Sequence, residues 1–265
     1  MDDVETDKGT DPPAILQLNG ITIVPDQPRN PVAIFGAGGF GLDLGIDLIR
    51  YGDRVVFLDD DPASKSKIDA IGATLVGGRE KLEDPRFLRR HDLIIGIGDN
   101  HLRRRLSAIA CRNGGRLVTV IHPDASVGLR ITLGEGVIVM RGAMVSNRAT
   151  IGKGSIVLNG ASVPHDCVIG DFVNVCDGVT LGACWVGDDS FIGMGATTNS
   201  RIRIGRNVMV GLGAAVVHDI PDNVVVAGVP ARVINRRPPL EHDTDSETAL
   251  YSASRSIVVP IGQGS

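Results

Sequence analysis

The sequence predicts an α/β + β protein: a small Rossmann-like α/β domain followed by a parallel β-helix of hexapeptide repeats. Two observations support this prediction. A six-residue repeat of aliphatic residues fills much of the second half of the chain, and a glycine-rich turn opens the first half. The composition agrees with a solenoid, because 34 glycines suit its corners and an aromatic content of only 3% suits its thin interior.

The repeat places an aliphatic residue at every sixth position from Val127 to Leu181 without a miss. The register then slips by one residue and continues from Val186 to Val216, with Thr198 as its single polar member. Three hexads make one triangular coil, so we expect about five coils whose aliphatic side chains point inward and whose corner residues point outward. Glycine recurs at the fourth position of the hexad, where a corner needs a positive φ; these residues are Gly136, Gly142, Gly154, Gly160 and Gly178.

The chain divides into four predicted segments. Residues 1–30 are rich in Asp, Pro and Thr and are expected to form a flexible arm with one short strand. Residues 31–121 should form the α/β domain, and residues 122–235 the β-helix. Residues 236–265 are expected to be a disordered tail, apart from an apolar patch at 257–261. Within the α/β domain, apolar runs predict strands at 32–35, 54–58, 93–97 and 116–121, and helices are predicted at 42–51 and 101–113.

Composition excludes several classes of protein. A net charge of −4 and a pI near 5.9 give no footprint for nucleic acid or for an anionic membrane. The apolar runs are far shorter than a membrane span, and the acidic N-terminal residues do not resemble a secretory signal, so we expect a cytoplasmic protein without membrane insertion. The cysteines lack CxxC spacing and the histidines form no cluster on the β-helix, so no metal site is expected.

The glycine-rich turn 36–41 follows a predicted strand and precedes a predicted helix. Its backbone N–H groups can therefore face a phosphate at the helix N-terminus. Asp59 ends the next strand, where an acceptor for a ribose hydroxyl belongs. The motif alone leaves open a dinucleotide, another nucleotide or a tight turn without a ligand. Because the second half of a dinucleotide-binding fold is missing, a nucleotide or nucleotide-sugar is favoured.

One hexad carries a histidine and a carboxylate at outward corner positions. His165 beside Asp166 can act as a general base, because the carboxylate favours the imidazolium and fixes the tautomer of the ring. The alternative is a polar corner residue without a chemical role, and this is the commoner case for a surface histidine.

Together these motifs resemble the bacterial sialic acid O-acetyltransferase (NeuD) family of hexapeptide-repeat acyltransferases. The similarity is greatest to its PglD-like members, which N-acetylate UDP-linked 4-amino sugars. It covers about residues 31–235 and rests on segments 36–41, 57–60, 97–100 with Arg103, 121–123, 158–170 and 228–232. The resemblance implies a left-handed β-helix, a homotrimer, acetyl-CoA as co-substrate and a nucleotide-linked amino sugar as acceptor.

The resemblance also assigns roles to residues. His165 would deprotonate the acceptor amine or hydroxyl, Asp166 would tune it, and the acetyl group would pass directly from thioester to acceptor. Acetyl-CoA would lie along the solenoid wall between two subunits, with its pantetheine near Asn174 and Met194 and its adenine end near Leu212. The nucleotide-sugar would bind at Gly38, Gly39, Phe40, Asp59, Asp60, Gly98 and His101.

The leading hypothesis is N-acetylation of a nucleotide-linked amino sugar, a 4-amino-4,6-dideoxy sugar, for bacterial surface glycan synthesis. Two alternatives stay open: O-acetylation of sialic acid or a related sugar, and a non-catalytic nucleotide-sugar-binding partner in a glycan pathway. Three features depart from the family pattern. Phe40 stands where the family usually has histidine, the register slips beside Trp185, and the two terminal segments have no counterpart.

Overall fold

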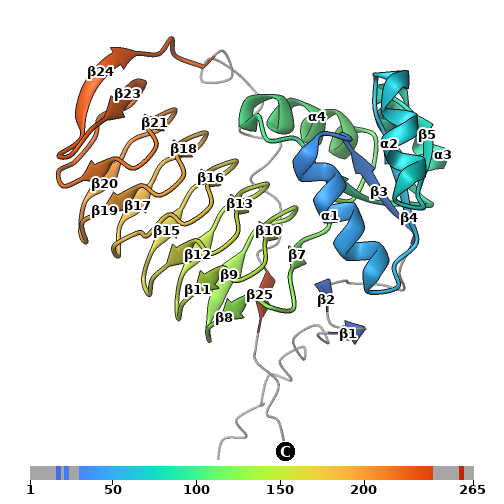
Figure 1. The fold of residues 1–265 in the computed structure, drawn as a ribbon, viewed down its shortest axis with the longest axis horizontal. Coiled ribbons are helices and arrows are strands. Elements are labelled where there is room, and N and C mark those ends of the chain that lie inside the picture. Colours follow the sequence, from blue (N-terminus) through green and yellow to red (C-terminus); the bar gives the residue numbers. More distant parts are fainter. Residues whose placement is uncertain (1–15, 19–20, 24–29, 241–256, 260–265) are drawn as a thin grey trace, which may run out of the picture.

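A computed structural model describes residues 16–18, 21–23, 30–240 and 257–259. It consists of a small α/β domain packed against one side of a long stack of short parallel strands (Figure 1). The predicted fold class is confirmed: a Rossmann-like α/β domain precedes a left-handed parallel β-helix. Most of the predicted arm 1–30 and of the predicted tail 236–265 lies outside the described residues.

The α/β domain is built on a four-stranded parallel sheet in the order β5-β4-β3-β6. Helices join successive strands, as the alternation of apolar runs and helical segments predicts. The strands are β3 (Val32–Phe35), β4 (Val55–Leu58), β5 (Thr74–Gly77) and β6 (Asp92–Ile95). The helices are α1 (Gly39–Arg50), α2 (Lys65–Ala70), α3 (Pro85–Leu88) and α4 (Asn100–Arg112), with 3-10 turns at η1 (Pro62–Ser64) and η2 (Arg79–Glu83).

The strand predicted at 116–121 forms only in part. The chain makes a single bridge to β6, between Leu93 and Leu117, and then leaves the sheet. Strand β7 (Val120–Ile121) pairs instead with β10 (Ile138–Val139) of the β-helix. The apolar side chains of this segment are buried because they fill the junction between the two parts of the molecule, where Val120 packs in one cluster with residues of the α/β core.

The β-helix has three walls of short strands, nearly all two residues long, and the chain visits the walls in the same order in every coil (Figure 1). Wall 1 consists of β7, β10, β13 (Ile156–Val157), β16 (Asn174–Val175), β18 (Phe191–Ile192), β21 (Met209–Val210) and β23 (Val224–Ala227). Wall 2 consists of β8 (Ser126–Val127), β11 (Met144–Val145), β14 (Ser162–Val163), β19 (Thr197–Thr198) and β22 (Ala215–Val216). Wall 3 consists of β9 (Ile131–Leu133), β12 (Thr150–Ile151), β15 (Val168–Ile169), β17 (Trp185–Val186) and β20 (Arg203–Ile204).

The corners and the interior follow the hexad. We call the corner between walls 1 and 2 corner 1, that between walls 2 and 3 corner 2, and that between walls 3 and 1 corner 3. All five glycines expected to have a positive φ do so. The aliphatic rungs form one buried cluster along the stack. The register slip removes one residue from corner 2, so Val168 pairs with Trp185 instead of Val186.

Antiparallel strands close several ends of the stack. Strand β2 (Ile21–Ile23) pairs with β7 at one end of wall 1, and β24 (Arg232–Arg236) pairs with β23 at the other. Strand β25 (Ile257–Val259) pairs with β9 at the end of wall 3, and β1 (Leu16–Leu18) pairs with β2. The arm therefore contributes two short strands rather than one, and the apolar patch of the tail contributes β25.

The α/β domain covers the lower part of wall 1. Ile138, Met140 and Ile156, which would otherwise face solvent, are buried in one cluster with Leu44 and Leu48 of α1. No helix in the described part of the chain is long and apolar enough to span a membrane.

Candidate active site

His165 lies at corner 2, where the predicted corner position leaves it outside the aliphatic stack. Its side chain is 63% exposed, and its Nδ1 lies 2.8 Å from Oδ2 of Asp166. A carboxylate on Nδ1 fixes that nitrogen as the protonated one, so Nε2 is the nitrogen left to accept a proton from a ligand. The two predicted catalytic residues are thus brought together in the arrangement that a general base requires.

Arg148 completes this corner, and its role was not predicted from the sequence. From the coil below, its Nε and Nη2 donate to Oδ1 and Oδ2 of Asp166 at 2.7 and 2.8 Å. This two-point contact, and secondarily His165, holds the pKa of Asp166 well below its usual range. The repeat contained the signal: Arg148 and Asp166 occupy equivalent positions of successive coils, and both have a positive φ.

Replacing Arg148 with glutamine is expected to lower kcat by about tenfold, because Asp166 then loses the two guanidinium hydrogen bonds that fix its orientation toward His165. The KM for the expected co-substrate should stay unchanged. The matched control is Arg130→Gln, one coil further down the same corner, where the φ is also positive. Steady-state kinetics checks this, and equal rates for the two variants would contradict a positioning role for Arg148.

The cysteine side chains nearest to this corner lie inside the stack and not on its surface. Cys167 and Cys184 point into the stack, with their Sγ atoms 4.0 Å apart and both side chains buried. The contact with Cys184, together with burial, raises the pKa of Cys167. Cys167 is therefore a packing residue and is not placed to attack a thioester at the surface.

The glycine-rich turn separates into packing glycines and open glycines. A Cβ on Gly41 would lie 2.0 Å from the Gly36 oxygen, and one on Gly36 would lie 2.5 Å from Ile97 Cδ1, so these positions let two turns approach each other. A Cβ on Gly38 or Gly39 would meet nothing within 4 Å. The two glycines predicted to contact substrate thus leave open space beside the N-terminus of α1, where N–H groups favour an anion.

Both predicted ribose- or base-binding carboxylates are also held by the chain. Asp59 Oδ2 accepts from the Ala37 N–H at 2.7 Å, so this side chain fixes the glycine-rich turn. Asp60 accepts from the backbone and the Nε of Arg79 at 2.8 and 2.7 Å, and this contact lowers the pKa of Asp60. Arg79 is a second residue whose role was not predicted from the sequence, and it brings a cation to the rim of the predicted nucleotide site. Phe40 is half-buried and packs against the domain core.

Asn174 and Gly98 meet at the junction of the two domains. Asn174 is only 3% exposed; its Nδ2 donates to the Gly98 oxygen at 2.6 Å, and its Oδ1 accepts from Nη2 of Arg103 at 2.5 Å. Arg103 is 1% exposed and also donates to the carbonyls of Ile97 and Gly154, each at 2.8 Å. Burial lowers the pKa of Arg103 to about 9, so the guanidinium keeps its charge at neutral pH. In this chain Asn174 therefore ties two domains together, and its predicted contact with the coenzyme stays a prediction.

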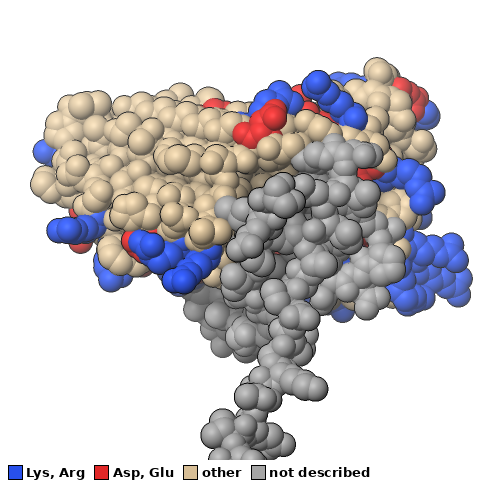
Figure 2. Space-filling view, turned by 90° about the horizontal axis from the view of Figure 1, so that it is seen from below, with Lys and Arg blue, Asp and Glu red and all other residues tan. Residues whose placement is uncertain are grey.

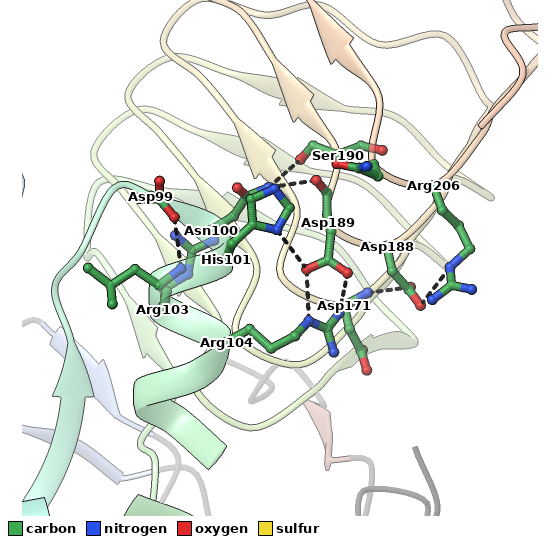
Figure 3. Close-up of polar contacts among 12 residues, drawn as sticks. Asp99, Asn100, His101, Arg103, Arg104, Asp171, Asp188, Asp189, Ser190 and Arg206 are labelled. Atoms are coloured by element: carbon green, nitrogen blue, oxygen red, sulfur yellow. Dashed lines mark hydrogen bonds and ion pairs between the residues drawn. The ribbon is translucent and has the colours of Figure 1, made fainter. Parts of the chain in front are cut away.

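His101 lies in the same junction, in the first turn of α4 and two residues before Arg103 (Figure 3). Its Nε2 accepts from Nη2 of Arg237 at 2.9 Å, and its Nδ1 lies 3.9 Å from Oδ1 of the buried Asp189. Arg104 holds Asp189 through two hydrogen bonds of 2.7 and 2.8 Å. His101 thus faces corner 3 of the β-helix, and its predicted contact with the nucleotide-sugar stays a prediction.

The other predicted coenzyme residues lie at a different corner from His165. Met194 and Leu212 are 52% and 68% exposed and follow β18 and β21, which places them on corner 1. His165 stands on corner 2, with wall 2 between the two corners. One chain alone does not bring these three residues to a common site. Among the described residues, no group of three or more His, Cys, Asp or Glu side chains is placed to hold a metal ion.

Comparisons with known proteins identify relatives of both parts of the chain. Residues 31–109 match the family model described as the PglD N-terminal domain. The acetyltransferase domain of PglB from Neisseria gonorrhoeae is 34% identical, over 78% of this chain and 100% of that one, with a TM-score of 0.69. GDP-perosamine N-acetyltransferase from Caulobacter crescentus, solved as a mutant with CoA and GDP-perosamine, is 35% identical over 78% of this chain and 97% of that one, with a TM-score of 0.72.

Curated acetyltransferases match the chain over different lengths. A serine acetyltransferase from Bacillus licheniformis is 34% identical over 69% of this chain and 74% of its own length. The chain spans only 29% of the 2,3,4,5-tetrahydropyridine-2,6-dicarboxylate N-acetyltransferase of Alkaliphilus metalliredigens and 55% of the serine acetyltransferase of Synechococcus elongatus.

A β-helix of hexapeptide coils with an outward histidine and carboxylate at one corner defines a class, the hexapeptide-repeat acyltransferases. The α/β domain in front of it narrows the assignment. This chain belongs to the hexapeptide acetyltransferase family and carries the PglD N-terminal domain.

Proposed function

We propose that the protein is an acetyl-CoA-dependent N-acetyltransferase that acts on the amino group of a nucleotide-linked sugar. The observation that carries the proposal is His165, exposed at a corner and oriented by Asp166 and Arg148. The relatives support it, because the Caulobacter enzyme was solved with CoA and GDP-perosamine and the Neisseria domain with acetyl coenzyme A. A 4-amino-4,6-dideoxy sugar used for surface glycan synthesis in the cytoplasm is the acceptor that we propose.

The proposed reaction follows from the arrangement of His165 and Asp166 at corner 2. Nε2 of His165 accepts a proton from the acceptor amine as the nitrogen attacks the thioester carbonyl. A carbon–nitrogen bond forms, the carbon–sulfur bond breaks, and the imidazolium returns the proton to the leaving thiolate. The Asp166 carboxylate stabilises the imidazolium between these two transfers. Because Cys167 and Cys184 point into the stack and are buried, the acetyl group passes directly between the substrates.

The outer surface of wall 2 supports an assembly of three copies around an axis parallel to the stack. The outward residues of this wall are uncharged and partly or largely exposed: Ser126, Met144, Ser162, Thr180, Thr197 and Ala215. Figure 2 likewise shows a broad flank of the β-helix with few charged side chains. Closing three such walls around one axis brings corner 2 of one subunit to corner 1 of the next. Acetyl-CoA would then lie between His165 and the Met194 and Leu212 of the partner subunit.

The α/β domain provides the proposed nucleotide site. The open space at Gly38 and Gly39 lies beside the N–H groups that begin α1, where a pyrophosphate fits. Asp59 and Asp60 follow directly after β4 and retain acceptor capacity for a ribose or base. Phe40 provides an apolar face at the turn in place of the histidine typical of the family.

The test is to incubate the protein with acetyl-CoA and UDP-, dTDP-, GDP- and CMP-linked sugars, with and without a free amine, and to follow thiol release. Release only with amino sugars supports the proposal and identifies the nucleotide. Release with hydroxyl acceptors would favour O-acetylation, and nucleotide-sugar binding without acetyl-CoA binding would favour a non-catalytic partner. Sedimentation should give a trimer at micromolar concentration, and a stable monomer would contradict the site between subunits.

A further inference from the structure

Two buried thiols lie directly behind corner 2, and the proposed reaction does not use them. Cys167 follows Asp166 in the chain, and Cys184 occupies the equivalent place in the next coil, because Val168 pairs with Trp185. Both thiol side chains are fully buried, and their Sγ atoms lie 4.0 Å apart. All four cysteines of the chain are free thiols in the structure, so this pair is in its reduced form.

The backbone spacing at this pair permits a disulfide. Paired strands stand about 4.8 Å apart, and the Cα atoms of a disulfide are usually about 4.4–6.8 Å apart. Cys167 and Cys184 directly precede two paired residues, so their backbones already have this spacing. What remains is the approach of the two Sγ atoms from 4.0 Å to about 2.05 Å.

The surroundings make Cys184 the more reactive of the two thiols. Thr198 is the polar member of the aliphatic repeat, and its Oγ1 donates to Cys184 Sγ at 3.7 Å. The contact with Cys167, helped by that with Thr198 and opposed by burial, lowers the pKa of Cys184. The thiolate is the form that attacks an oxidant. Cys184 is therefore the attacking sulfur, and Cys167 is the sulfur that closes the bond.

The layer of protein that covers Cys184 is thin. Gly182 and Ala183 form corner 2 in this coil, where the register slip removes one residue. Both residues are partly exposed, and neither carries a side chain larger than a methyl group. A small neutral oxidant such as hydrogen peroxide therefore has a short path to Cys184.

A bond between the two sulfurs would displace the catalytic corner. The Cβ atoms of a disulfide are usually about 3.5–4.5 Å apart, which is less than the strand spacing, so Cys167 has to move toward the next coil. Asp166 directly precedes Cys167 and has a φ of 59°. Its contacts with Arg148 at 2.7 and 2.8 Å and with His165 at 2.8 Å leave little room for displacement. A displacement of about 1 Å near a reacting group can cost about a hundredfold in rate.

We propose that Cys167 and Cys184 form a reversible thiol–disulfide switch, which lowers the activity of the neighbouring corner when a peroxide oxidises the pair. The switch adds regulation to the proposed function, and its effect on the rate rests on that function. The disulfide draws Cys167 toward the next coil and turns Asp166 away from His165. A thiol reductant restores the two thiols by exchange.

The oxidation proceeds in two steps. The Cys184 thiolate attacks one oxygen of hydrogen peroxide: a sulfur–oxygen bond forms, the oxygen–oxygen bond breaks, and the leaving hydroxide takes up the proton that the thiol has lost. The sulfur of Cys167 then attacks Cys184 Sγ, the sulfur–oxygen bond breaks, and the hydroxide leaves as water with the proton of Cys167. Two thiols are thereby oxidised to one disulfide, and one peroxide is reduced to two waters.

The experiment treats the full-length protein with hydrogen peroxide and measures free thiols, mass, Trp185 emission and kcat. The matched control is the double variant Cys111→Ala, Cys176→Ala, which keeps only the proposed pair. The wild-type protein and this control should lose two thiols and the mass of two hydrogen atoms per chain. Their kcat should fall by about tenfold and return with dithiothreitol. The emission of Trp185, which follows Cys184, should change with the same time course.

Two single variants separate the steps. Cys184→Ala should form no disulfide and should keep its rate in peroxide. Cys167→Ala should stop at the sulfenic acid of Cys184, which dimedone traps. Both substitutions shorten a small buried side chain, and the thermal midpoint before oxidation shows whether each variant has folded.

Two results would overturn the proposal: unchanged thiols at Cys167 and Cys184 in the oxidised wild-type protein, or an equal loss of rate in oxidised Cys184→Ala. The thiol count, the mass and the Trp185 emission do not depend on turnover. If acetyl transfer fails with every acceptor, the proposed function is wrong, while these three measurements still decide whether the pair forms the disulfide.

Discussion

Replacing His165 with alanine is expected to lower kcat by about a thousandfold, because His165 is the group in this coil of corner 2 that is oriented to accept the proton of the amine. His165 makes no buried contact, and its side chain is 63% exposed, so the fold and the binding of acetyl-CoA should be retained. Thiol release under saturating substrates measures the loss, and equilibrium binding of acetyl-CoA measures what remains.

The chain offers a matched control for this variant. His218 also stands at corner 2, is exposed and precedes an aspartate, but Asp219 accepts from the Arg203 N–H at 2.8 Å. His218→Ala should therefore leave kcat unchanged. A His165→Ala variant that keeps more than about a tenth of the wild-type rate would remove His165 from the mechanism.

Replacing Arg103 with methionine is expected to lower the free energy of unfolding by about 3 kcal/mol. The substitution keeps an unbranched side chain but leaves the Ile97 and Gly154 carbonyls and Asn174 Oδ1 without their donor inside a buried junction. Because these groups belong to both domains, the loss should also loosen the turn that carries Gly98 and raise the KM for the nucleotide-sugar.

Urea unfolding followed by fluorescence checks this expectation, since Trp185 is the only tryptophan and lies in wall 3 of the β-helix. The control is Arg105→Met on the exposed side of the same helix, which should change stability by less than about 0.5 kcal/mol. Equal midpoints for the two variants would show that the junction contributes little to the stability of the β-helix.

The repeat made the β-helix predictable because each rung meets only its neighbours one coil away. The six-residue period therefore predicts which residues form strands, which side chains point inward and which residues form corners. It also predicts the positive φ of Gly136 and Gly154, which occupy corner positions. At corner 2, the period predicted that His165 and Asp166 lie on the outside of the stack. The same period places Arg148 one coil before Asp166, so their contact could also have been predicted.

Contacts between the domains were not predictable in this way. The burial of Asn174 depends on Arg103, 71 positions away in the sequence, and nothing local distinguishes an outward wall residue that will be covered from one that will not. Strand β5 was missed because it is short and ends in Gly77. The apolar pattern predicts one strand over 116–121 because it continues from the sheet of the α/β domain into wall 1 of the β-helix, where β7 pairs with β10.

The antiparallel strands at the ends of the stack have a consequence for how molecules meet one another. An open parallel stack presents unpaired backbone groups at each end, and a second copy could add its coils there and grow into a filament. Strands β2 and β24 close wall 1 at both ends, and β25 closes one end of wall 3 with a reversed chain direction. A further copy arriving in parallel register finds its hydrogen-bonding positions already taken on those walls. Growth along the stack is thereby disfavoured, and association is left to the sides.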